Sequence, residues 1–165
     1  MKKRQFIKFY DKYSPDIYRF VYIKLNSVED SEDITSEAFL QFWKSNQENR
    51  EKVKNHRALL YKIAKNLVTD FYRKKSNSEI KKEPDAYEFQ KIVSKVNLEK
   101  DVETDMEMEK VKKALRKLSG EYQNMVIWRY LNELSYKEIS YISGKPENSV
   151  RVLTHRAMKE LKKQF

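Results

Sequence analysis

Apolar residues in the first half of the chain recur every three or four positions, which is the spacing of one helix face. The pattern predicts a helix over residues 6–25, a second helix that begins around Val28 and a third over about 57–75. Pro15 lies inside the first pattern. Because proline removes a helical hydrogen bond, we expect a kink or break near Ser14.

Residues 45–56 lack any periodicity and are predicted to form a loop between the second and third helices. The apolar stripes of the three helices form the expected core of the first half. They comprise Phe6, Phe9, Tyr10, Tyr13, Ile17, Phe20, Val21 and Leu25; Ile34, Ala38, Phe39, Phe42 and Trp43; and Leu60, Ile63, Ala64, Leu67, Val68 and Phe71.

Shorter apolar repeats, separated by turn signals, fill the last third of the chain. A helix is expected to resume near Met106 and to end at Gly120, because glycine commonly terminates helices. Another helix is expected over 122–131. Ser135 and Glu138 have the spacing of a capping box, which marks the start of a further short helix.

A turn over 143–145 contains a glycine, and Pro146 fits the first turn of a last helix. The apolar seam of this helix is predicted to comprise Val150, Leu153, Ala157 and Leu161. Which of Leu153 and Thr154 faces inward is left open.

Glycine and proline are scarce, with two and three residues among 165, and this favours long helices over turn-rich sheets. We therefore predict an all-α fold of two small helical domains, the second containing a helix-turn-helix. The predicted domains are 1–75 and 105–165. Residues 76–104 are predicted to be a flexible linker with one frayed helical segment around 87–98.

Several classes of protein fit the composition poorly. The absence of cysteine excludes disulfides and thiolate metal sites, and two histidines argue against a histidine metal centre. No glycine-rich phosphate loop or nucleophile–base arrangement occurs, so we expect no enzyme, no cofactor and no small-molecule substrate. No apolar stretch is long enough to span a membrane, and a cytoplasmic protein without membrane insertion is expected.

The net charge of +10 favours a polyanionic partner such as nucleic acid. The charge is uneven: residues 1–75 carry +7, residues 76–104 carry −2 and residues 105–165 carry +5. An alternative left open by charge alone is that the lysine content reflects codon bias and solubility.

The segment 135–162 has the pattern of a helix-turn-helix, in which the second helix enters the major groove. Arginine suits guanine, asparagine suits adenine and valine suits a thymine methyl group. We expect Arg151, Val152 and His155 to read bases and Arg156 to contact a flanking phosphate. The full set of expected DNA contacts is Asn148, Ser149, Arg151, Val152, His155 and Arg156. The alternative is a helical hairpin with a solvated charged face.

The third predicted helix carries basic and polar residues opposite its apolar stripe. Cations suit phosphates and a tyrosine can stack on an unpaired base, so this face is a second candidate nucleic-acid contact. It comprises Arg57, Tyr61, Lys62, Lys65, Asn66, Thr69 and Arg73. A solvated surface is the alternative interpretation.

The second predicted helix is acidic on one side, where Asp30, Asp33 and Glu37 align. The helix dipole explains acidic residues in the first turn but explains Glu37 less well. Because an acidic face cannot suit DNA, we expect it to bind a protein.

These motifs, in this order, resemble the extracytoplasmic-function (ECF) type of bacterial sigma factor. The resemblance rests on residues 9–13, 17–20 and 32–43 in the first half, on 60–67 with Asp70, and on 115–118, 130–139, 149–151 and 155–157 in the second. The chain departs from the family pattern at Ser36, Asn148 and the Leu153–Thr154 pair.

The resemblance implies a factor that gives RNA polymerase its promoter specificity. It places Asp30, Asp33, Glu37, Phe39 and Gln41 against core polymerase. The 45–56 loop and the third helix would bind and melt the minus-ten element, and the last helix would bind the minus-thirty-five element. An anti-sigma factor is left open as a further partner. The alternative is a helix-turn-helix regulator that binds DNA without polymerase.

Overall fold

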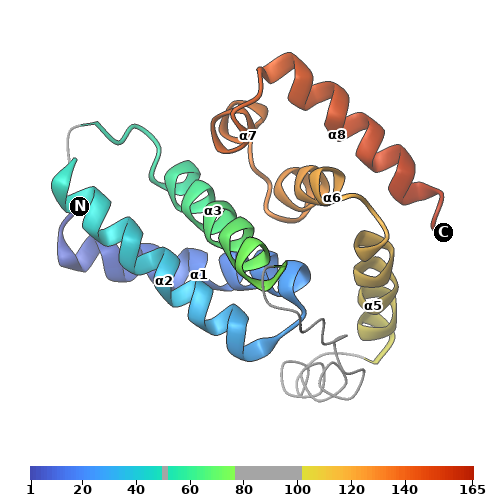
Figure 1. The fold of residues 1–165 in the computed structure, drawn as a ribbon, viewed down its shortest axis with the longest axis horizontal. Helices are drawn as coiled ribbons and strands as arrows, with labels where there is room; N and C mark the ends of the chain where they lie inside the picture. The colour runs from blue at the N-terminus through green and yellow to red at the C-terminus, as the bar shows by residue number, and fades with distance from the viewer. Residues whose placement is uncertain (50–51, 77–101) are drawn as a thin grey trace. The chain divides into compact units, whose positions relative to one another are not determined.

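The computed structural model describes residues 1–49, 52–76 and 102–165, with side chains from residue 106 in the last range. The chain divides into two compact units, Met1–Ala86 and Tyr87–Phe165. The described residues of both units are helical and contain no strand, which confirms the predicted all-α class (Figure 1). The linker predicted over 76–104 and the segment expected around 87–98 fall almost wholly outside the described residues.

Three helices that pack against one another pairwise form the first unit (Figure 1). They are α1 (Lys3–Leu25), α2 (Val28–Glu48) and α3 (His56–Ser76). Aromatic rings fill much of the space between them, and Phe9 stacks on Phe42 with centroids 4.7 Å apart. The largest fully buried side chains of this unit are Ile17, Phe20, Phe39, Phe42, Leu60 and Tyr61.

The break expected near Ser14 is not present, because α1 is continuous through Pro15. Pro15 is exposed, so its ring points away from the core. Residues on both sides of it are anchored: Phe6 packs 4.7 Å from Trp43, and Ile17 is fully buried. Tertiary packing of this long helix therefore outweighs the missing hydrogen bond.

The loop expected over 45–56 is shorter than predicted, because α2 continues to Glu48 and α3 already begins at His56. Asn46 is fully buried although it is polar, which keeps the last turn of α2 in the core. Its side chain is hydrogen-bonded on both sides, as described below, so a segment without apolar periodicity still forms a helix.

The second unit contains α5 (Val102–Arg116), α6 (Gly120–Val126), η1 (Ile127–Leu131), α7 (Tyr136–Ser143) and α8 (Glu147–Lys162). Helix α5 begins four residues before Met106, inside the segment predicted as linker. Ser119 accepts a hydrogen bond from the Tyr122 N–H and caps α6, so Gly120 begins a helix and does not end one. η1 is a π-helical turn that continues α6, closed by the Asn132 N–H to the Ile127 carbonyl at 2.9 Å.

No helix among the described residues is both long and apolar enough to cross a membrane.

Candidate nucleic-acid interface

Helices α7 and α8 form a helix-turn-helix whose start and turn are set by local sequence. The Ser135 Oγ accepts from the Glu138 N–H at 3.0 Å, and the Glu138 carboxylate accepts from the Ser135 N–H at 3.1 Å, which confirms the predicted capping box. Gly144 ends α7 in the left-handed region at φ 72°, which glycine adopts without strain. The chain then turns at Pro146, which precedes the first residue of α8.

The buried side of α8 fixes which residues face outward. Val150, Ala157 and Leu161 are buried as predicted, but the fourth member of the seam is Thr154, at 1% exposure, and Leu153 is only half-buried. The Thr154 hydroxyl donates to the Val150 carbonyl at 2.7 Å, so this polar side chain is satisfied within its own helix. The Leu153–Thr154 ambiguity is thereby resolved.

With Thr154 in the buried seam, the middle of the outer face of α8 differs from the one expected from the sequence, which comprised Arg151, Val152 and His155. Val152, at 48% exposure, lies opposite the seam, with Asn148 beside it. At about 100° per residue, His155 and Arg156 each lie about 50° from the middle of this face and Arg151 about 90° from it. A shallow hollow is lined by Asn148, Ser149, Val152, Leu153 and Arg156.

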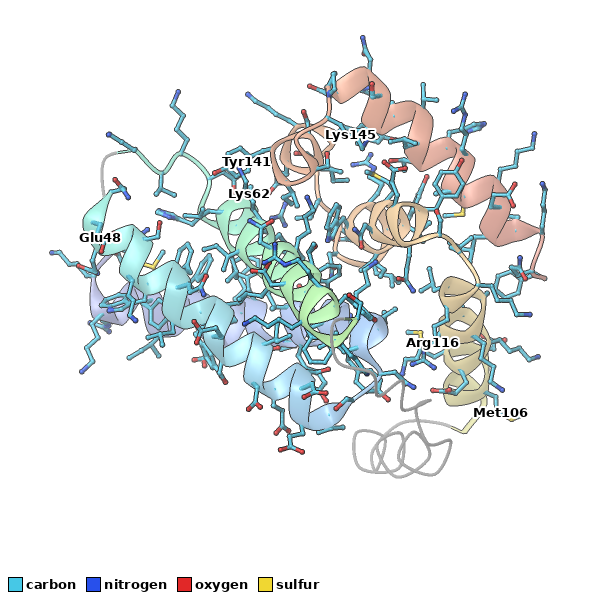
Figure 2. All side chains as sticks on the ribbon, in the orientation of Figure 1. Glu48, Lys62, Met106, Arg116, Tyr141 and Lys145 are labelled. Carbon is cyan, nitrogen blue, oxygen red and sulfur yellow. The ribbon has the colours of Figure 1, made fainter. Side chains whose placement is uncertain are left out.

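On α3, the polar residues expected to share one side do so. Asn66, Thr69 and Arg73 are exposed, and Lys62, labelled in Figure 2, lies half-buried among them. Lys65 and Arg57 are also half-buried. The Arg73 guanidinium pairs with Asp70 at 2.8 Å, and the Thr69 hydroxyl donates to the Lys65 carbonyl at 3.0 Å.

The prediction that Tyr61 belongs to this exposed face is wrong, because only 1% of Tyr61 is exposed. Tyr61, Ala64 and Val68 have i, i+3, i+7 spacing and form the middle of the buried stripe, since α3 packs against both α1 and α2. Burial raises the pKa of the Tyr61 hydroxyl, with a further contribution from Asp16. A ring in this position cannot stack on a base without unfolding the core.

The acidic side of α2 is exposed around Asp33 and Glu37, and Asp30 is half-buried. The Gln41 amide donates to the Glu37 carboxylate at 2.9 Å. Phe39 cannot belong to this surface, because it is a core residue that is only 2% exposed, and its ring centroid lies 4.7 Å from that of Tyr10. The i+3 position after Glu37 that does face outward is Leu40, which is 46% exposed and which the sequence reasoning missed.

Comparison with known proteins covers both units. The sequence pattern of Sigma-70 region 2 matches residues 9–78, and that of Sigma-70 region 4 matches residues 108–161. The ECF RNA polymerase sigma factor SigW of Bacillus subtilis is 29% identical over 94% of this chain and 86% of its own length. The RNA polymerase sigma factor YlaC of the same organism is 27% identical over all of this chain and 95% of its own length. The chain belongs to the ECF sigma factors.

The fold of this sigma factor recurs in solved structures. The sigma factor RpoE of Bartonella quintana, solved with the anti-sigma factor NepR, matches 98% of this chain and 96% of its own with a TM-score of 0.73 and 18% identity. CnrH, solved with the cytosolic domain of CnrY, matches 98% of this chain and 87% of its own with a TM-score of 0.70 and 16% identity. These likenesses concern the fold.

As an ECF sigma factor, the chain directs RNA polymerase to promoters and initiates transcription there, with core polymerase and promoter DNA as its partners. This confirms the family and function predicted from the sequence. The alternative of a regulator that acts without polymerase is not favoured.

The sigma factor also holds contacts that sequence reasoning missed. The Asn46 amide nitrogen lies 3.0 Å from His56 Nδ1, and the Met1 ammonium donates to the Asn46 amide oxygen at 2.9 Å. The Asn46–His56 contact joins the last turn of α2 to the first residue of α3 and so closes the base of the loop between these helices. The His56 ring lies edge-on to Phe42, with centroids 5.9 Å apart.

Burial, together with the N-terminal ammonium, lowers the pKa of His56 below its usual 6.5. Because the unfolded chain binds the proton more readily, protonation favours unfolding, and stability should fall as the pH drops below about 6.5. We expect the denaturant midpoint of the first unit to fall between about pH 7.5 and 5.5 in the unchanged protein and to fall less in His56→Gln. His155→Gln, in the second unit, is the control and should keep the full decrease; equal decreases in all three proteins would contradict the assignment.

Proposed function

We propose that the exposed acidic face of α2 binds core polymerase. The observation that carries the proposal is the placement of Asp33, Glu37 and Leu40 on the side of α2 directed away from the core. Two carboxylates beside an exposed leucine have the character of a protein-binding surface with a charged margin. In a chain of net charge +10, such a surface repels DNA and suits a basic protein partner.

Reversal of Asp33 and Glu37 to lysine tests this surface. We expect core-polymerase affinity to fall on the order of tenfold or more, because like charges placed across an interface cost several kcal/mol. Titration of labelled sigma factor with core enzyme measures the loss, and thermal unfolding checks that the fold is kept.

Glu32→Lys is the matched control for this reversal, because Glu32 is an exposed carboxylate of the same helix about 100° around it from Asp33. It should leave the affinity nearly unchanged. An equal loss in Glu32→Lys would indicate a general effect of charge, and an unchanged affinity in the double reversal would reject the surface.

The α3 face is proposed to hold the minus-ten region of the promoter, together with the loop that the Asn46–His56 contact closes. Lys62, Asn66, Thr69 and Arg73 supply donors along one side, with Lys65 and Arg57 half-buried beside them. Their chemistry suits phosphates of a displaced strand. Tyr61 has no part in this proposal, because it is a core residue.

The outer face of α8 is proposed to read the minus-thirty-five element. Val152 and Asn148 lie at its middle, His155 and Arg156 flank them, and Ser149 and Arg151 lie at its edges. Asn148 and Arg156 can donate to base edges, and Val152 can contact a thymine methyl group. Lys159 is exposed on the same face one turn further and suits a phosphate.

We further propose that the protein acts in the cytoplasm, has no catalytic activity of its own and is held inactive by an anti-sigma factor. The support for this partner is that RpoE of Bartonella quintana was solved with the anti-sigma factor NepR, and CnrH with the cytosolic domain of CnrY. An anti-sigma factor that covers the α2 face would compete with core polymerase in the titration above.

A further inference from the structure

One buried asparagine links the last turn of α2 to the first turn of α3 by hydrogen bonds. Asn46 is fully buried, and its side-chain nitrogen lies 3.0 Å from Nδ1 of His56, the first residue of α3. On the other side, the Asn46 amide oxygen accepts from the Met1 ammonium at 2.9 Å. The amide is therefore bonded at both ends and held in one orientation.

These two partners fix the direction of the contact with His56. Because an ammonium group can only donate, the Asn46 atom that faces Met1 is the amide oxygen, and the group that faces His56 is the NH2 group. His56 Nδ1 must therefore accept, which requires the neutral imidazole with its proton on Nε2. A protonated ring carries N–H on both nitrogens and would present one of them to the Asn46 NH2 group.

The groups that surround His56 do not favour a protonated ring. Turning the Asn46 amide over would offer its oxygen to His56 but would place its NH2 group against the Met1 ammonium. On other sides the ring meets the rings of Phe9 and Phe42 edge-on, with centroids 6.4 and 5.9 Å away. The charged group that acts on His56 is the Met1 ammonium, which would stand as a second positive charge beside a protonated ring. Protonation therefore breaks the Asn46–His56 contact and does not invert it.

The contact holds together the two ends of the loop between α2 and α3. The start of α3 also has a local bond, in which the Asn55 side-chain oxygen accepts from the Ala58 N–H at 2.9 Å and caps the helix. The Asn46–His56 contact is different, because it spans ten residues and ties one end of the loop to the other. Its loss should change how the loop ends are placed while the cap of α3 is kept.

The loop adjoins the face of α3 that is proposed to hold the minus-ten region. Lys52 and Lys54 are exposed in the loop, and the polar face of α3 follows in the chain. Groups that are ordered before a ligand arrives bind it at a lower entropic cost. A loop with joined ends is therefore expected to hold an opened strand more readily than a loop whose ends can separate.

We propose that Asn46 and neutral His56 are positioning residues that hold this loop for promoter opening, and that protonation of His56 weakens that step. The inference rests on the proposed minus-ten role of the α3 face and its loop. It differs from a purely structural role, because promoter opening then depends on the charge of one imidazole while core-polymerase binding through the α2 face does not.

Open-complex formation by holoenzyme on a duplex promoter tests the inference, and core-polymerase affinity of the same samples checks that the first unit is folded. His56→Leu cannot accept from Asn46 and should lower open-complex formation about two- to tenfold at neutral pH, the factor that one net hydrogen bond supplies. His56→Asn is the conservative variant, because its amide oxygen can replace Nδ1 as the acceptor. It should keep most of the opening.

The pH profile separates positioning from stability. Between about pH 7.5 and 5.5, opening by the unchanged protein should fall toward the level of His56→Leu, whereas His56→Asn, which does not titrate, should lose less. His155 is the other histidine of the chain and is present in all of these proteins, so a difference between their profiles belongs to His56. Asn46→Ala should lower opening as His56→Leu does.

Parallel pH profiles for the unchanged protein and His56→Asn would overturn the inference. So would a loss of core affinity in His56→Leu as large as its loss of opening, because the contact would then serve only the fold. Alanine at Asn66 and Arg73 tests the minus-ten role separately. If these substitutions lower opening and His56→Leu does not, the positioning role alone is lost; if none of them lowers it, the minus-ten role falls and the inference with it.

Discussion

Tyr61→Ala is expected to destabilise the first unit by about 3–5 kcal/mol, the range for truncating a large buried aromatic residue. The ring is among the largest fully buried side chains, its centroid lies 6.4 Å from that of Phe20, and it lies in the middle of the buried stripe of α3. Single domains are typically stable by only about 5–15 kcal/mol, so a large share of the stability would be lost. Chemical denaturation followed by circular dichroism measures the change.

Two control variants separate this core role from a role in handling DNA. Tyr61→Phe keeps the ring and should retain most of the stability. Asn66→Ala removes an exposed residue of the same helix and should change stability by no more than about 0.5 kcal/mol. If Tyr61→Ala kept the unfolding midpoint of the unchanged protein but failed to open duplex promoters, the ring would be a DNA contact and its burial would be misassigned.

Tyr61 also shows how far periodicity predicts a face. The apolar stripe of α3 was identified by its aliphatic residues, and a tyrosine next to lysines was assigned to the polar side. Because α3 packs against two helices, its buried arc is turned toward Tyr61, and Ile63 and Leu67 of the predicted aliphatic stripe are only half-buried. Whether an amphipathic residue at the margin of an apolar stripe is buried therefore depends on how many helices pack against its own helix. The sequence of one helix does not contain that number.

Two local signals in the second unit, by contrast, were predicted correctly. The Ser135–Glu138 capping box and the turn at Gly144 depend on residues within a few positions of each other, and both have the predicted geometry. Hydropathy alone does not predict that Thr154 is buried. Its hydroxyl donates to the Val150 carbonyl one turn earlier, which removes the cost of burying an unpaired polar group.

Contacts between distant residues were beyond the sequence analysis. The Asn46–His56 contact and the contacts of Arg129 and Arg151 with the Tyr136 ring join residues on different elements. Asn46 and Tyr136 are single polar or aromatic residues with no repeating partner, so no periodic pattern marks either of them. Only the packing of the helices brings their partners within reach.

Because Thr154 and not Leu153 is buried, the outer face of α8 is turned relative to the predicted one. This exchanges the base-reading and phosphate-binding roles first expected of Arg151 and Arg156. Arg156 borders the shallow hollow together with Asn148 and Val152, whereas Arg151 is turned toward Tyr136 and Glu147. The residue nearer the middle of the outer face has the shorter path to the base edges. Arg156, and not Arg151, is therefore the expected base-reading arginine.

Arg156→Ala should accordingly cost about 1–3 kcal/mol on the preferred minus-thirty-five element and relax the preference at one base pair, most plainly a guanine. Arg151→Ala should weaken binding to all elements alike, because a cation at the edge of this face is expected to contact a phosphate and not a base. Holoenzyme binding to a randomised upstream library measures both changes in one experiment. Lys159→Ala, further along the same face, is the control for loss of one positive charge near the DNA and should leave the base preference intact.

A change in preference with Arg151→Ala, but not with Arg156→Ala, would mean that α8 meets the groove with the opposite edge of its outer face. In that case Arg151 must leave the Tyr136 ring when DNA binds.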